Sequence, residues 1–148
     1  MNALFRYAVL LIGLVCATAA SAQTVPAGFV KVAEGEVLVM RAGSPLFLKA
    51  GDAVYEADRI ATTTNQSIGI TLRDNSRISA GPNTILVMQT FKFEPETEQY
   101  GLVISVLRGT LSFVSGLLTK LAPETVRIET KTATVAVRGT RLLIRTEE

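Results

Sequence analysis

Alternation of apolar and polar residues along many short segments is the feature that most constrains the fold. Apolar side chains take every second position from Ile68 to Leu72 and from Val126 to Ile128. This period of two places alternate side chains on opposite faces of a β-strand. Thr, Val and Ile make up 37 of the 126 residues from position 23 onward, and β-branched side chains favour strands. The sequence therefore predicts an all-β protein.

The strand-like runs are short and separated by turn residues. They cover residues 36–41, 67–72, 77–80, 84–93, 102–114, 126–130, 134–137 and 141–145, with turns at 43–45, 51–52, 74–76 and 81–83. Short strands at intervals of about 8 to 12 residues favour a single domain with solenoid-like, roll or sandwich stacking. One short helix is predicted over 115–121, and the acidic segment 94–99 is interpreted as an exposed loop.

The first 22 residues have the layout of a secretory signal peptide. A basic start ending at Arg6 precedes an apolar run over 7–17 and then small residues. The run is shorter than the roughly 20 residues of a membrane-spanning helix. Cleavage is predicted after Ala22, so residues 23–148 are expected to be periplasmic or secreted, with no transmembrane anchor. Lipidation of Cys16 is the less favoured alternative, because Val15 stands where a lipobox carries a small residue.

The residue inventory limits the chemistry that is available. The chain has no histidine, and its one cysteine lies in the predicted leader. Ser-His-Asp triads, Cys-His pairs and the usual zinc sites are therefore excluded. We expect a non-enzymatic protein without a cofactor.

Three aspartates, Asp52, Asp58 and Asp74, are the candidate acidic site residues. Each stands beside turn residues, where aspartate commonly hydrogen-bonds the nearby backbone. A structural turn role is the preferred interpretation. A calcium site and a carboxylate-dependent hydrolase are the alternatives.

The C-terminal segment is basic. It carries Arg127, Lys131, Arg138, Arg141 and Arg145 against Glu129. No aromatic residues are interleaved, so nucleic acid is not an expected partner. The preferred interpretation is a solvated strand face, and the alternative is contact with an anionic envelope glycan or an acidic partner.

An Arg-Gly-Thr triplet occurs twice, 30 residues apart, within 106–114 and 135–144. This echo fits stacked rungs of a short solenoid. In the second copy, Arg138, Gly139 and Thr140, we expect Gly139 to lie at a bend between two buried segments, where the backbone either bulges or approaches a neighbour closely. Arg138 is expected to reach carbonyl oxygens or a carboxylate, with partner binding as the alternative.

Several segments resemble the FecR domain. They are GEVLVMR at 35–41, GDAVYEADRIAT at 51–62, LRDNSRIS at 72–79, 106–109, and TATVAVRGT at 132–140. The resemblance implies an all-β domain with solenoid-like stacking, found in bacterial envelopes. It also implies protein interaction rather than catalysis, as in transmembrane regulators that pass iron-uptake signals to sigma factors.

Two local departures from the family pattern concern glycine positions. Asn75 stands where the family has glycine, and because asparagine tolerates positive φ, we expect a left-handed turn residue there. Ala57 also replaces a glycine, which leaves a different turn type open. The sigma-binding segment, membrane helix and receptor-binding domain of those regulators are not recognised here. We therefore expect a stand-alone, exported FecR-like interaction module in envelope signalling, with an envelope glycan or peptidoglycan binder as the alternative.

Overall fold

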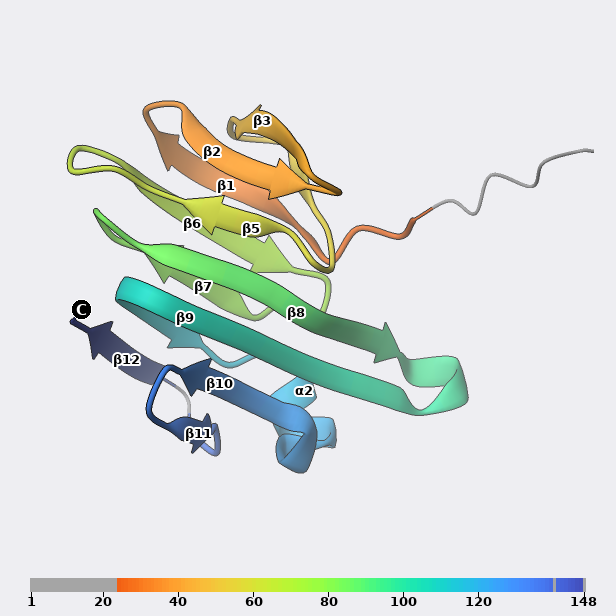
Figure 1. Cartoon of the computed structure of the whole chain (residues 1–148). Helices are drawn as coiled ribbons and strands as arrows, with labels where there is room; N and C mark the ends of the chain where they lie inside the picture. The colour runs from red at the N-terminus through yellow and green to blue at the C-terminus, as the bar shows by residue number, and fades with distance from the viewer. Residues whose placement is uncertain (1–23, 140, 148) are drawn as a thin grey trace, which may run out of the picture.

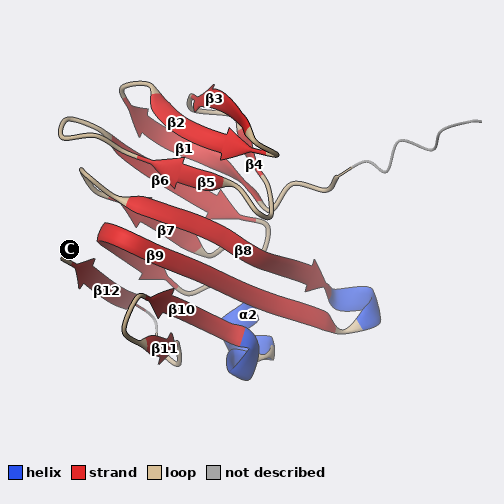
Figure 2. Cartoon of the chain, in the orientation of Figure 1, coloured by secondary structure: helices blue, strands red, loops and turns tan. Residues whose placement is uncertain are grey.

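The computed structural model describes residues 24–139 and 141–147, so the predicted leader and Thr140 lie outside the described residues. The strands are β1 (Gly28–Glu34), β2 (Val37–Arg41), β3 (Ser44–Leu48), β4 (Ala53–Val54), β5 (Arg59–Ala61), β6 (Ser67–Leu72), β7 (Arg77–Ala80), β8 (Ile85–Glu94), β9 (Gln99–Val114), β10 (Val126–Thr130), β11 (Thr134–Ala136) and β12 (Arg141–Thr146). The short helices are η1 (Pro95–Thr97), α2 (Leu118–Leu121) and η2 (Pro123–Thr125) (Figures 1 and 2).

The strands form one sheet that folds over on itself at β9 (Figure 1). The front layer runs β3-β2-β5-β8-β9-β10-β11, and the back layer runs β4-β1-β6-β7-β9-β12. Up to Arg108, β9 pairs with β8 and β10, whereas from Gly109 it pairs with β7 and β12. The pairing is antiparallel except between β9 and β10. The two halves of β9 therefore belong to opposite layers.

The hydrophobic core lies between the two layers. On β6, Ile68, Ile70 and Leu72 are buried while the residues between them are half-buried, as the alternation predicted. Leu86 and Ile104 of the front layer are also fully buried and belong to the same core. In both layers, the apolar residues of the alternating pattern therefore point inward, toward the core.

The predicted all-β single domain is confirmed, and most of the predicted runs are strands. The predicted helix over 115–121 is shorter than expected, because only Leu118–Leu121 is α-helical. Segment 94–99 is exposed, as predicted, and contains the single turn η1. Four strands were missed by the sequence pattern: β1, β3, β4 and β5. In the described part of the chain, no helix combines the length and apolarity needed to cross a membrane.

Candidate interaction surface

Strand β12 forms an edge of the back layer. Among the described residues it pairs only with β9, with Leu142 opposite Phe113 and Ile144 opposite Leu111. The residues that alternate with these, Arg141, Leu143 and Arg145, are exposed, and Leu143 is 69% exposed. An open strand edge offers unpaired backbone groups to a partner. β12 therefore presents a basic, apolar, basic series beside an open edge.

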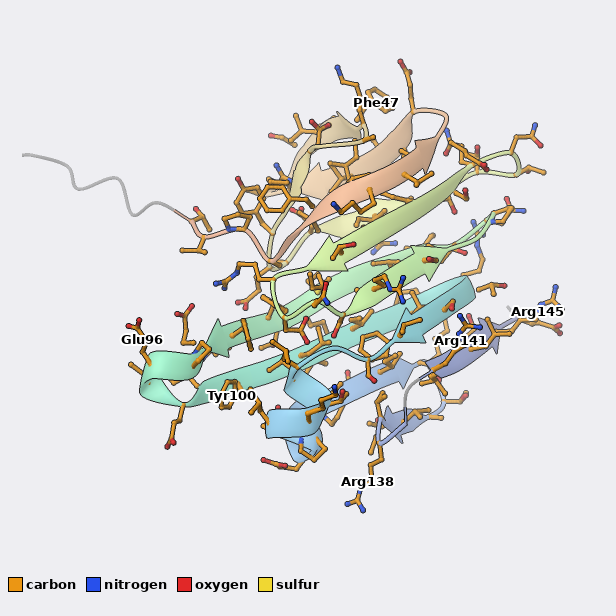
Figure 3. The ribbon with its side chains drawn as sticks, turned by 180° about the vertical axis from the view of Figure 1, so that it is seen from behind. Phe47, Glu96, Tyr100, Arg138, Arg141 and Arg145 are labelled. Atoms are coloured by element: carbon orange, nitrogen blue, oxygen red, sulfur yellow. The ribbon has the colours of Figure 1, made fainter. Side chains whose placement is uncertain are left out.

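The remaining basic residues of the C-terminal segment gather at the same end of the molecule. The five exposed cations are Arg127 on β10, Lys131 after β10, Arg138 after β11, and Arg141 and Arg145 on β12; we call them the basic end. Figure 3 shows Arg138, Arg141 and Arg145 pointing away from the ribbon. Within residues 24–139 and 141–147, none of the five forms an ion pair. All five side chains are exposed to solvent, which both the solvated-face interpretation and the partner-contact alternative require.

The second Arg-Gly-Thr triplet has the predicted bend at its glycine, but the close backbone approach is absent. Gly139 is exposed, and an added Cβ would meet no atom within 4 Å, so the expected close approach is wrong. Arg138 has no hydrogen bond to a described carbonyl or carboxylate. Close approach occurs instead at Gly109 of the first triplet, where φ is +96° and a Cβ would overlap Thr84. Gly109 is the residue at which β9 passes from the front layer to the back layer.

Asp58 is a fully buried carboxylate paired with Arg41. Arg41 donates from Nε to Oδ1 at 2.9 Å and from a terminal nitrogen to Oδ2 at 2.7 Å, and the Tyr55 amide also donates to Oδ2 at 2.9 Å. The hydrogen bond to Asp58 raises the pKa of Arg41, while burial opposes the rise. The guanidinium also lies 4.5 Å from the Tyr55 ring centroid. Asp58 is thus a structural anion, and the sequence analysis missed its partner Arg41 although GEVLVMR ends on that residue.

Ala57, just before Asp58, adopts a φ of +69° and is exposed. Alanine therefore takes here a left-handed conformation of the kind that favours glycine. At the other substituted position, Asn75 also has a φ of +69°, which confirms the predicted left-handed turn residue between β6 and β7.

Asp74 joins the β6–β7 turn to the segment that follows β9. Its buried carboxylate accepts hydrogen bonds from the Ser76 amide at 3.1 Å, the Ser76 hydroxyl at 2.6 Å and the Leu118 amide at 3.2 Å. Its carbonyl oxygen accepts from the Leu117 amide at 2.8 Å. Gly116 packs so tightly on this turn that a Cβ would overlap the Asp74 and Ser76 backbone. The two segments are therefore fixed relative to each other.

Asp52 has a simpler turn role. Its carboxylate accepts a hydrogen bond from the Lys49 amide at 2.8 Å, and its own amide donates to the Lys49 carbonyl at 3.1 Å. The turn interpretation is thus confirmed for all three aspartates, which occupy three separate turns. No three potential metal-ligating side chains come together in the described part of the chain.

A groove of about 530 Å³ lies on the outer face of the back layer, beside the Asp74 turn. It is lined by the cations Lys31, Arg77 and Lys120, by the polar residues Thr71, Asn75 and Ser115, and by Val114, Gly116 and Leu117; we call it the cationic groove. Arg77 pairs in register with Thr71 on one side and Val114 on the other. No acidic side chain is among the described residues that line it. The sequence analysis missed this site, because its cations lie on β1, β7 and α2, far apart in the chain.

Comparison with protein families matched the model described as FecR protein over residues 58–148. Comparison with curated proteins found no match, and comparison with solved structures found none. The match covers β5 to β12 and includes the basic end.

Proposed function

Because the chain belongs to the FecR family, we propose that it is a non-enzymatic interaction module of the periplasm that takes part in envelope signalling by binding another envelope protein. The observation that supports this proposal most directly is the open edge of β12 with its exposed Arg141, Leu143 and Arg145. The chain has no histidine, and its one cysteine lies in the proposed leader, which supports a role without chemistry.

The β12 edge suits a partner that adds an extended segment to the sheet. Main-chain hydrogen bonds would supply affinity, and the outward side chains would supply selectivity. Leu143 offers an apolar contact between two cations, so an acidic segment with an apolar residue is the complementary partner. Basic residues on an edge strand also discourage aggregation, which is the alternative role for Arg141 and Arg145.

Capture from envelope extracts tests the proposal. The full chain, expressed with its own leader, should enrich an envelope protein, and Arg141→Glu combined with Arg145→Glu should abolish that enrichment. Lys92→Glu, at an exposed position on β8, is the matched control and should retain the partner. Enrichment that is no greater than with an unrelated β domain, or that survives the double charge reversal, contradicts the proposal.

Export is tested separately. Mass spectrometry of the protein recovered from the periplasm is expected to show a chain that begins at Gln23, after cleavage behind Ala22. A chain that retains Met1, or one with a lipid on Cys16, contradicts the proposed maturation.

A second candidate function is binding of an anionic envelope glycan or peptidoglycan. The five exposed cations of the basic end, which form no ion pair among the described residues, favour it. Retention on purified peptidoglycan or anionic polysaccharide should then weaken as salt is added, because salt screens exposed charges. Absence of retention at low salt eliminates this candidate.

A further inference from the structure

We propose that the cationic groove is a binding site for a phosphate group. The site is distinct from the β12 edge used in the proposed function, since it is lined by Lys31, Arg77 and Lys120 and by none of the residues of β12. The hydrogen bonds that stabilise the aspartate turns do not involve these three cations, so turn stability does not explain why they lie in the same groove.

The charge of the groove supports an anionic ligand. Lys31 lies at a bulge of β1, Arg77 begins β7 and Lys120 lies on α2, so three separate elements bring cations to one place. None of the three forms an ion pair with a described residue. Like charges that share a depression repel one another, and a bound anion relieves that repulsion.

The kind of side chain supports phosphate in particular. The planar fork of Arg77 matches two oxygens of a phosphate group, and lysines such as Lys31 and Lys120 act as point charges beside them. A phosphate monoester carries a charge of about −1.5 to −2 at neutral pH. It therefore neutralises three cations more fully than a carboxylate ligand, which carries a single negative charge. Asn75 and Ser115, which also line the groove, carry neutral hydrogen-bond donors.

The wall of the groove is held in place before any ligand arrives. Asp74 and Ser76 bind the backbone of Gly116, Leu117 and Leu118, so the segment after β9 is fixed against the β6–β7 turn. The floor is the paired strands β6, β7 and β9. A preorganised site loses less entropy on binding. The volume of about 530 Å³ also leaves room for more than the phosphate group itself.

Isothermal titration calorimetry on the processed full chain tests the site with glucose 6-phosphate, inorganic phosphate and glucose. Saturable binding of either phosphate compound, with none for glucose, supports the proposal. If glucose 6-phosphate binds more tightly than inorganic phosphate, the natural ligand is a phosphate group on a larger molecule. If the two bind with equal affinity, the natural ligand is free phosphate. No saturable binding of either phosphate compound overturns the proposal.

Matched variants separate the groove from net charge. Arg77→Gln and Lys120→Gln are each expected to weaken binding by about tenfold. Arg145→Gln removes the same charge at the basic end and should leave affinity nearly unchanged. Equal weakening by Arg145→Gln and Arg77→Gln overturns the proposal.

Thermal melts test whether each variant is folded. If Arg77→Gln does not fold, Lys120→Gln, at an exposed position outside the sheet, provides the same comparison. The two proposals can fail independently. Partner capture that persists in Arg77→Gln and Lys120→Gln would support the proposed function alone, and phosphate binding by a chain that captures no envelope protein would support the groove alone.

Discussion

Asp74 and Leu118 are 44 residues apart in sequence, yet the carboxylate of Asp74 accepts a hydrogen bond from the Leu118 amide at 3.2 Å. The same carboxylate binds both the amide and the hydroxyl of Ser76. One buried side chain thus fixes the β6–β7 turn, the start of α2 and one wall of the cationic groove.

Replacement of Asp74 by alanine should therefore destabilise the domain strongly. The substitution leaves the buried Ser76 and Leu118 donors without this acceptor, and we expect a loss of about 2–3 kcal/mol in the free energy of unfolding. Asp52→Ala, in a more exposed turn, is the control and should lose about 1 kcal/mol or less. Urea denaturation measures both, and equal losses would show that Asp74 is an ordinary turn residue.

The two Arg-Gly-Thr triplets should respond differently to the same substitution. Gly109→Ala places a Cβ against Thr84 at a positive φ, so we expect a loss of about 2 kcal/mol or more, seen as a fall of several degrees in Tm. Gly139→Ala meets open space and should leave Tm within about one degree. Thermal melts monitored by circular dichroism compare the two. A fall in Tm confined to Gly139→Ala would contradict the structural assignment.

Replacing Arg41 should destabilise the protein more than replacing its ion-pair partner Asp58. Arg41→Met leaves a fully buried carboxylate without its counter-charge, and we expect a loss of about 3 kcal/mol or more. Asp58→Asn should cost less, because the Arg41 side chain is 30% exposed and can be solvated. Glu94→Gln, which breaks the exposed 3.5 Å pair with Arg73, is the control and should change stability by less than about 1 kcal/mol. A greater loss from Asp58→Asn than from Arg41→Met, measured by chemical denaturation, would be inconsistent with this account.

The left-handed conformation of Asn75 can be tested with two substitutions. Asn75→Gly should be neutral or mildly stabilising, because glycine adopts a φ of +69° without strain. Asn75→Val should lose about 1 kcal/mol or more, since a β-branched residue strongly disfavours that conformation. Urea denaturation measures both variants. Equal stability would contradict the left-handed conformation and indicate a negative φ at this position.

Most of the longer strands that carry the core could be predicted from local sequence. The alternation from Ile68 to Leu72 and from Val126 to Ile128 requires one apolar face, and burial of that face needs only a second layer. Asn75 could be predicted as well, because a left-handed turn depends on the backbone preference of one residue. Strands β1 and β3 were missed, since their exposed apolar and polar residues do not alternate regularly: Phe29 and Val32 of β1 and Leu46 and Phe47 of β3 face solvent.

Relations between distant residues were decided only by the tertiary structure. Gly109 and Gly139 stand in identical triplets, so no local pattern distinguishes them. One is confined because β9 changes layers against Thr84, and the other lies in an exposed connection with open space around it. Likewise, strand pairing brings Arg41 to Asp58 and Lys31 close to Arg77. Lys120 joins the same groove because Asp74 and Ser76 hold the segment before α2 against the β6–β7 turn. Sequence determines which face of a strand a side chain takes, whereas its neighbours across the sheet depend on the register and order of strands that are far apart in the chain.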